Sequence, residues 1–187
     1  MKILLTLALS LLVQSSQAAT QNGVTFPDNE KIGEKSLVLN GLGTRLASFL
    51  GFKVKVYVAA LYVDKKSSQE DDILTNDSPK KIVMEFTRDV SKDKITKSWE
   101  EGFTKNCKEK CGVQQTHLQK FLGLMADMKE KERMTFTFYP DKLTIENKQK
   151  ELNTITNADF ANIILSVFIG PNPPNTELKN GLLGKAE

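Results

Sequence analysis

The sequence predicts an α+β fold in which a layer of helices covers one face of a large antiparallel sheet. Several short segments alternate apolar and polar residues, as strands with one buried face do, and others repeat apolar residues at helical spacing. Along the chain these segments run in the order strands, helices, strands and helix. That order is typical of helices gathered on one side of an antiparallel sheet, whereas a regular alternation of strand and helix would indicate a parallel sheet.

The composition indicates one folded domain. The chain has 187 residues, of which 40% are hydrophobic and 26% are charged. The 26 Lys and Arg residues are interspersed with 23 Asp and Glu residues, and the most basic stretch, Lys105–Lys110, is interrupted by Cys107 and Glu109. Because nucleic-acid binding requires a clustered basic face, we expect no nucleic-acid partner.

The N-terminus has the pattern of a secretory signal peptide. Lys2 precedes the apolar run Ile3–Val13, and Ser16 and Ala18 supply small residues at the spacing of a signal-peptidase site. The apolar run is shorter than the roughly 20 residues that span a bilayer. We therefore expect residues 1–18 to be removed and residues 19–187 to form the domain. The mature protein would be periplasmic or secreted and would have no stable membrane span.

The first strands follow this segment. Gly23–Pro27 and Ser36–Asn40 are predicted as short strands of a hairpin, joined by the turn-rich segment Pro27–Gly33. Asn40–Arg45 is interpreted as a turn because two glycines punctuate it. The β-rich run Phe52–Val63 then predicts a long central strand.

The middle of the chain changes from strand to helix. Asp64–Lys80 is polar and predicted as a loop, and Ile82–Thr87 alternates as a strand. Ser91–Lys105 is predicted as a helix capped by Asp89 or Ser91, because apolar residues recur there at four-residue spacing. A second helix is marked by an apolar stripe that consists of Leu118, Phe121, Leu122, Met125 and Met128.

Sheet returns in the last third and is followed by two helices. The predicted strands of this meander are Met134–Phe138, Leu143–Ile145 and Glu151–Ile155. Asn157 is predicted to cap a helix that ends at Gly170 and Pro171. A short terminal helix is expected from Thr176 to about Leu183.

The two cysteines, Cys107 and Cys111, lie four residues apart. In an oxidising compartment they can pair, and on one helix face their Cα atoms are close enough for a disulfide, although the short loop would add little stability. Free thiols and metal binding remain open alternatives. His117 is the only histidine and no second pair of soft ligands lies nearby, so we expect no metal site.

Motifs for nucleotide and nucleophilic chemistry are absent. Gly41-x-Gly43 lacks the third glycine of a dinucleotide loop, no phosphate-binding loop motif occurs, and we expect no cofactor. His117 is interpreted as an exposed or capping residue of a helix rather than a catalytic base. Catalytic residues therefore cannot be named from these motifs.

Arg45 is the residue that needs an explanation, because it lies among apolar neighbours. It can turn to solvent, pair with a protein acid or receive an anionic ligand, since burial of an unpaired charge is costly. Tyr57 and Tyr62 follow on the next strand. Their odd-even offset places them on opposite sheet faces, so only one of them can share the side of Arg45.

Two long segments resemble the chalcone isomerase-like family, especially its exported bacterial branch. They are Leu37–Arg45 and Gly51–Val63; Phe86–Ser91, Phe168–Pro174 and Leu178–Gly184 resemble later parts of the family in the same order. The resemblance implies an open-faced β-sandwich with a ligand cleft between sheet and helices. It also implies that Arg45 and Tyr57 bind the ligand, which would be a small apolar molecule with an anionic head, either a fatty acid or a phenolic compound.

The resemblance leaves three functions open. The first is binding of a fatty acid, which requires only a cleft with Arg45 and Tyr57 at its polar end. The second is an intramolecular lyase reaction on a chalcone-like phenolic enone, in which Tyr57 stands where the plant enzymes carry a threonine. The third is a non-catalytic envelope protein with a filled cleft and a protein partner. Lys80 or Lys81 can match a second cation of the enzymes, whereas composition favours solubilising lysines at a strand edge.

Overall fold

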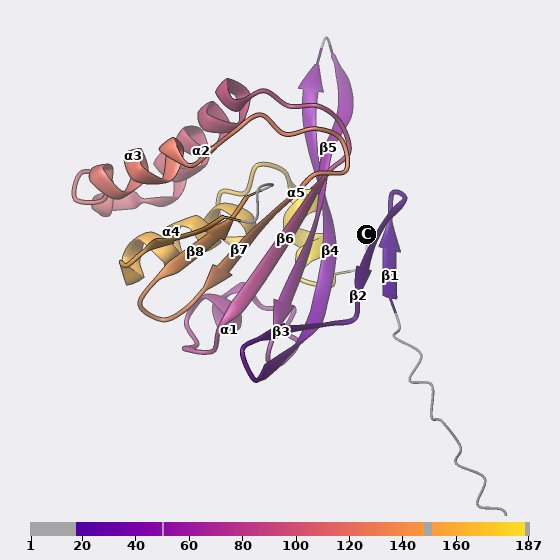
Figure 1. The fold of residues 1–187 in the computed structure, drawn as a ribbon, viewed down its shortest axis with the longest axis horizontal. Helices are drawn as coiled ribbons and strands as arrows, with labels where there is room; N and C mark the ends of the chain where they lie inside the picture. Colours follow the sequence, from indigo (N-terminus) through magenta and orange to yellow (C-terminus); the bar gives the residue numbers. More distant parts are fainter. Residues whose placement is uncertain (1–17, 50, 148–150, 186–187) are drawn as a thin grey trace, which may run out of the picture.

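The computed structural model describes residues 18–49, 51–147 and 151–185. They form one seven-stranded antiparallel sheet, a separate two-stranded hairpin and a group of helices (Figure 1). The predicted signal peptide lies almost wholly outside the described residues. The strands are β1 (Ala18–Gln21), β2 (Val24–Pro27), β3 (Asn29–Ile32), β4 (Lys35–Phe49), β5 (Phe52–Val63), β6 (Lys80–Phe86), β7 (Arg133–Phe138), β8 (Leu143–Glu146) and β9 (Leu152–Ile155).

Strands β3 to β9 follow one another in space in the order of the sequence, and each pair is antiparallel. The helices fill the connections and the C-terminal end of the chain. They are α1 (Glu70–Leu74), α2 (Lys92–Asn106), the 3₁₀ turn η1 (Lys108–Lys110), α3 (Gln115–Gly123), α4 (Ala158–Ile169) and α5 (Thr176–Leu182). The predicted α+β fold with helices on one face of an antiparallel sheet is confirmed.

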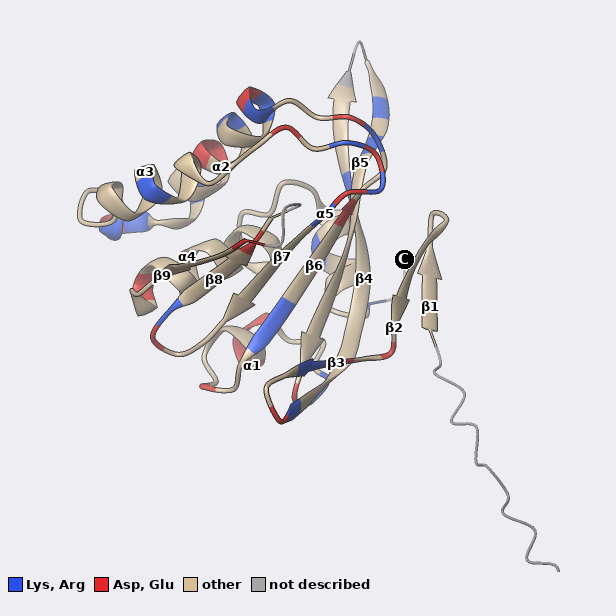
Figure 2. Cartoon of the chain, viewed as in Figure 1, with Lys and Arg blue, Asp and Glu red and all other residues tan. Residues whose placement is uncertain are grey.

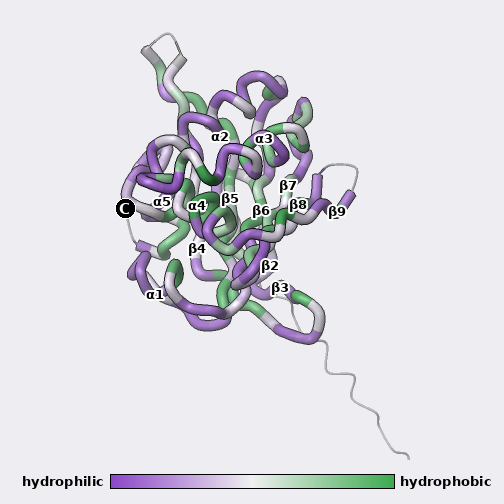
Figure 3. Tube along the Cα trace, turned by 90° about the vertical axis from the view of Figure 1, so that its left-hand side faces the viewer, coloured by the Kyte–Doolittle hydropathy of each residue, from purple (hydrophilic) through white to green (hydrophobic). Residues whose placement is uncertain are grey.

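The main core lies between the sheet and the helices. Alternate residues of the central strands, such as Leu61 and Met84, point toward α2, α3 and α4 and are buried there. Helix α4 is apolar nearly all round and lies in the centre of this layer (Figure 3). A helix of this kind is stable only when neighbours cover it on several sides, which explains why α2 and α5 both pack on it.

The opposite face of the sheet is covered only in part. Val24 and Phe26 of the β1–β2 hairpin pack there on Val58 and Tyr62 of β5. The hydroxyl of Tyr62 donates to the carbonyl of Pro27 at 2.9 Å, so this tyrosine holds the hairpin on the sheet. Farther along, β7 and β8 present polar residues on this face, of which Thr135 and Glu146 are half-buried and Thr137 and Thr144 are buried. This incomplete cover is the open face of the sandwich.

The interpretation of Asn40–Arg45 as a turn is wrong, because these residues form the middle of β4. The glycines allow a helix to approach the strand instead of reversing the chain. A Cβ on Gly41 would lie 2.1 Å from the carbonyl oxygen of Gly181, and one on Gly43 would lie 2.2 Å from that of Leu178. Helix α5 therefore lies with its backbone directly on β4.

The predicted N-terminal hairpin also has different partners. The segment before Gly23 forms β1, and β2 pairs with β1 rather than with the strand that contains Ser36. The turn between them is Asn22-Gly23, with φ values of 52° and 81°, which is the dipeptide that a tight two-residue hairpin favours. The expected turn after Pro27 contains β3, which pairs with β4.

The helices agree with the predictions except at three places. Helix α2 begins after Ser91, but the Ser91 side chain makes no capping hydrogen bond and Asp89 accepts from Lys129 and Glu130 instead. The polar segment after Asp64 contains the short helix α1, in which only Ile73 is buried. Helix α3 ends at Gly123, so Met125 and Met128 are buried outside the helix, and Met128 forms a β-bridge with Val90. At the start of α4, the Asn157 side chain accepts from the amide of Phe160 at 2.8 Å, as predicted for a helix cap.

Charges of both signs are distributed over the helices and strand ends (Figure 2). Surface ion pairs join elements that are distant in sequence, for example Lys129 with Asp89 at 2.7 Å and Lys110 with Asp159 at 2.6 Å. Among the helices of the described ranges, none combines the length and the apolar character that crossing a bilayer requires.

Candidate functional site

The structure brings Arg45 and Tyr57 together. They are directly opposite one another in the register of β4 and β5, and directly opposed residues project from the same face of a sheet. Tyr57 packs against the main core, on the side covered by helices, whereas Tyr62 lies in the cluster on the other face. Of the two candidate tyrosines, Tyr57 is thus the one that shares the side of Arg45.

Arg45 is half-buried and hydrogen-bonds to neutral oxygens. Its Nη1 donates to the carbonyl of Leu46 and lies 3.5 Å from Oδ1 of Asn175. No acid within the described ranges forms an ion pair with it. Its positive charge therefore keeps capacity for a charge-assisted hydrogen bond to an anion, which is stronger than a bond to a neutral oxygen.

Asn175, just before α5, is a site residue that the sequence reasoning missed. Its Oδ1 accepts from the amide of Leu46 at 3.1 Å, and its Nδ2 donates to the carbonyl of Thr44 at 3.0 Å. The side chain thus hydrogen-bonds the β4 backbone on both sides of Arg45, where the register of β4 and β5 shifts. An asparagine after Pro173-Pro174 and directly before a helix is typical of a helix cap. The Asn175 side chain, however, makes no capping hydrogen bond to α5.

A charged pair continues this network toward the end of the β4–β5 hairpin. Asn175 Nδ2 also lies 3.2 Å from Oε2 of Glu177, and Lys53 Nζ lies 2.8 Å from Oε1 of the same carboxylate. The hydrogen bond from Lys53 holds the pKa of Glu177 at about 2. Both oxygens of the Glu177 carboxylate are thus engaged, by Lys53 and by Asn175.

Burial raises the pKa of Tyr57 to about 12, although the nearby positive charge of Arg45 acts in the opposite direction. Tyr57 is therefore a neutral phenol at physiological pH, and it can donate a hydrogen bond. Its ring packs on Phe86 with a centroid distance of 5.8 Å, and no residue of the described part hydrogen-bonds its hydroxyl. Arg45 and Tyr57 thus offer two donors on the same side of the sheet.

Aromatic rings fill the centre of the interior. Trp99 of α2 lies with its ring 5.0 Å from that of Phe121, 5.3 Å from Phe136 and 5.5 Å from Phe168. A pocket of about 680 Å³ lies near α1 and α4, and one of about 190 Å³ lies on the open sheet face. Neither is lined by Arg45 or Tyr57.

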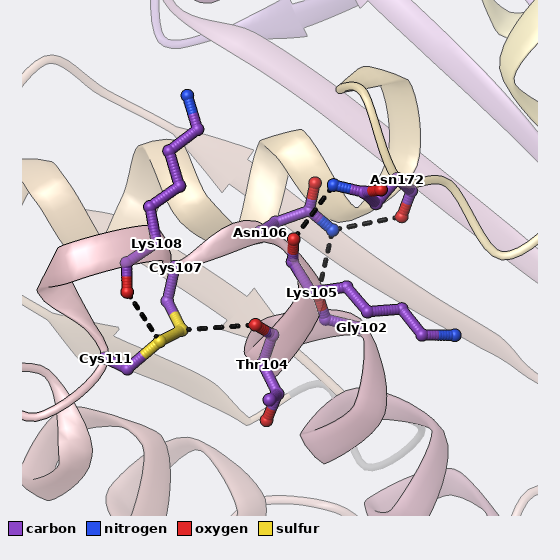
Figure 4. Close-up of a disulfide and its surroundings, with 8 residues drawn as sticks. All are labelled: Gly102, Thr104, Lys105, Asn106, Cys107, Lys108, Cys111 and Asn172. Atoms are coloured by element: carbon purple, nitrogen blue, oxygen red, sulfur yellow. Dashed lines mark hydrogen bonds between the residues drawn. A yellow bond between two sulfur atoms is a disulfide. The ribbon is translucent and has the colours of Figure 1, made fainter.

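The two cysteines are joined in a disulfide, with Cα atoms 4.9 Å apart. Figure 4 shows this bridge between the end of α2 and η1, next to Asn106 and Asn172. Cys107 is buried in the main core and Cys111 is half-buried. The bridge thus ties the turn after α2 to the core.

His117 differs from the expected exposed or capping residue. It is half-buried in α3, its ring lies 5.9 Å from that of Phe160, and its Nδ1 has no hydrogen-bond partner within the described residues. In the same part of the chain, no three His, Cys, Asp or Glu side chains are grouped so that they could hold a metal ion.

Comparisons with known proteins agree on the architecture. A family model described as chalcone isomerase-like matches residues 18–184. Among solved structures, the chain is similar to a fatty-acid binding protein of Arabidopsis thaliana, with a TM-score of 0.74 and 19% identity over 89% of this chain and 96% of that one. A search of curated proteins gave no match.

Proposed function

The chain belongs to the chalcone isomerase-like family, and on this premise we propose that it binds a small apolar carboxylic acid, such as a fatty acid, through Arg45 and Tyr57. The observation that carries the proposal is the pairing of these two residues on the helix-covered side of the sheet. Arg45 supplies a guanidinium without a protein acid among the described residues, and Tyr57 supplies a protonated hydroxyl. Together they match the two oxygens of a carboxylate.

The likeness to a fatty-acid binding protein supports this ligand class. An acyl chain that leaves water gains about 0.8 kcal/mol for each buried CH₂ group. Since aromatic rings fill the centre of the interior, a long acyl chain must displace some of them. The acyl-chain length at which affinity stops rising will therefore measure the space between the sheet and the helices. We expect the protein to select its ligands by chain length.

The test is a calorimetric titration of the delipidated protein with unbranched carboxylic acids of increasing length. Arg45→Ala and Tyr57→Phe should each weaken binding, Arg45→Ala by about tenfold or more, because it removes a charged donor. The matched controls are Arg88→Ala, which removes an exposed arginine, and Tyr139→Phe, which removes a hydroxyl from the residue that follows β7. Equal affinity of a folded Arg45→Ala variant would refute the carboxylate role.

The same site bears on the lyase alternative. In this reaction the phenol loses its proton and the phenolate oxygen attacks the β-carbon of the alkene, so that the π electrons shift to the carbonyl oxygen and form an enolate. Arg45 would stabilise this negative charge, and a proton from water then adds to the α-carbon. Absorbance during incubation with a chalcone measures this reaction. A rate well above the uncatalysed one, lost in Arg45→Ala, would replace the carrier function with an isomerase.

We also propose that the protein is exported and that residues 1–18 are removed. The N-terminal pattern supports this proposal, as does the disulfide, since such bonds persist in oxidising compartments. Cleavage after Ala18 would leave most of β1 to pair with β2. Mass spectrometry of protein from an exporting host should find Ala19 at the N-terminus, and a retained Met1 would contradict the proposal.

A further inference from the structure

Lys80, the first residue of β6, is a buried lysine. It is only 6% exposed, so the interpretation of this residue as a solubilising lysine at a strand edge is wrong. Its side chain lies on the helix-covered face, since Ile82 and Met84 alternate with it and belong to the main core. Its Nζ donates to the carbonyl of Asn76, and it forms no ion pair with an acid of the described ranges.

The pocket of about 680 Å³ lies directly beside Lys80. It is formed where α1, the end of α2, the end of β7 and one side of α4 meet, and its volume is in the range of small-molecule sites. Leu74, Phe138 and Leu165 supply apolar wall, and Ser166 and Lys80 supply polar groups. The pocket therefore suits a ligand that is partly apolar and has a group for the lysine.

Asn106 lines the same pocket and has an unused acceptor. It is 7% exposed, and its Nδ2 donates to the carbonyls of Gly102 at 2.8 Å and Asn172 at 3.0 Å. Its Oδ1 is buried without a partner within the described residues. A buried acceptor without a hydrogen bond is costly, so a ligand that donates an N–H to this oxygen would remove the cost.

The rim of the pocket limits the charge of the ligand. Two of its acids are paired, Asp159 with Lys110 and Glu70 with Lys179, whereas Asp71, Asp77 and Glu109 are exposed beside the exposed Lys108. The rim therefore carries more negative than positive charge and disfavours a ligand with several negative charges. Burial lowers the pKa of Lys80, whereas the negative charges of Asp64 and Asp77 act against that shift. A single carboxylate that reaches Lys80 would compensate its charge directly.

We propose that this pocket binds a small molecule with one carboxylate and an amide N–H, such as the C-terminal end of a short peptide. The carboxylate accepts from Lys80, and the amide donates to Oδ1 of Asn106. The site is separate from that of Arg45. Lys80 begins β6, whereas Phe86, the β6 residue that pairs with Tyr57, lies six residues farther along the strand, or roughly 20 Å from Lys80. It does not depend on the function proposed for Arg45.

The test is an NMR titration of the isotope-labelled full chain with an N-acetylated dipeptide at millimolar concentration. Amide signals of Lys80, Asn106 and Ser166 should shift. Lys80→Met should weaken binding by about tenfold or more, because it removes a charged donor. The matched control is Lys81→Met, since Lys81 belongs to the other sheet face, where it pairs with Glu30 at 2.8 Å.

Two modified ligands test the contacts without any change in the protein. A dipeptide with a C-terminal amide lacks the carboxylate, and one in which ester oxygens replace both N–H groups lacks the amide donor. Each of these ligands should bind at least about tenfold more weakly. Arg45→Ala should bind the dipeptide as the unaltered protein does, which separates this site from the first. Absence of binding, or equal binding by Lys80→Met or by either modified ligand, would overturn the proposal.

Discussion

Gly43 of β4 lies against the carbonyl oxygen of Leu178 in α5 so closely that a Cβ on the glycine would be 2.2 Å from that oxygen. Side chains can rotate away from a new methyl group, but a helix backbone can move only as a unit. The contact therefore fixes how near α5 lies to the sheet. It also positions Asn175, which precedes α5 and hydrogen-bonds the backbone beside Arg45.

Gly43→Ala is accordingly expected to destabilise the protein by about 3 kcal/mol, since over-packing of a core contact costs on that order. Chemical denaturation followed by the fluorescence of Trp99 measures the change. The control is Gly123→Ala at the end of α3, where a new Cβ meets nothing within 4 Å. That variant should be unchanged or more stable by at most about 1 kcal/mol, and equal losses in both would contradict the packing argument.

Asn175→Ala should cost about 1–3 kcal/mol, because it removes the side-chain hydrogen bonds to the backbone of Leu46 and of Thr44. Asn175→Asp keeps the acceptor and should recover part of the loss. Thermal unfolding of both variants measures the order of stability. A stability of Asn175→Ala equal to that of the unaltered protein would show that solvent replaces the side chain.

Asn175→Asp should also weaken binding of a carboxylic acid at Arg45. The Asn175 Oδ1 lies 3.5 Å from the Arg45 guanidinium, so an Asp carboxylate at this position can form an ion pair with Arg45 and compete with the carboxylate of the ligand. Calorimetric titration should therefore find lower affinity in Asn175→Asp than in Asn175→Ala. The reverse order would count against Arg45 as the anchor.

The stability of the protein should fall at high pH because of Tyr57. Burial raises its pKa from 10.0 to about 12, so its contribution is complete below the pKa of the unfolded chain and is lost as the pH rises through the folded value. Over this window the loss should reach about 2–3 kcal/mol. Denaturant unfolding at a series of alkaline pH values should show a shallower decline in Tyr57→Phe, and Tyr139→Phe serves as the control.

Reduction of the Cys107–Cys111 disulfide should cost about 2 kcal/mol or less, because the loop that it closes is very short. Intact-mass measurement after alkylation, with and without a reductant, establishes the bond, and thermal unfolding of a double Cys→Ser variant gives its contribution. A much larger loss of stability would indicate that the disulfide stabilises other parts of the fold besides the turn between α2 and α3.

Local patterns predicted the elements well where a single segment carried the information. The β-rich run Phe52–Val63 is β5 with the same bounds, and Asn157 caps α4 through its own side chain. The prediction of a turn at Asn40–Arg45 was wrong, because the sequence pattern of a glycine is the same in a turn and in a strand on which a helix packs closely. Only the position of α5, far along the chain, distinguishes the two.

By itself, the sequence determined the fold class, the family resemblance and the choice of Arg45 and Tyr57 as candidates, because periodicity, capping and motif order are properties of neighbouring residues. The tertiary structure alone decided that these two residues oppose one another, that Asn175 supports Arg45, and that Lys80 is buried beside a pocket. Each of these depends on strand register or on contacts between residues distant in sequence. Such contacts arise only when the whole chain folds and excludes water from its core.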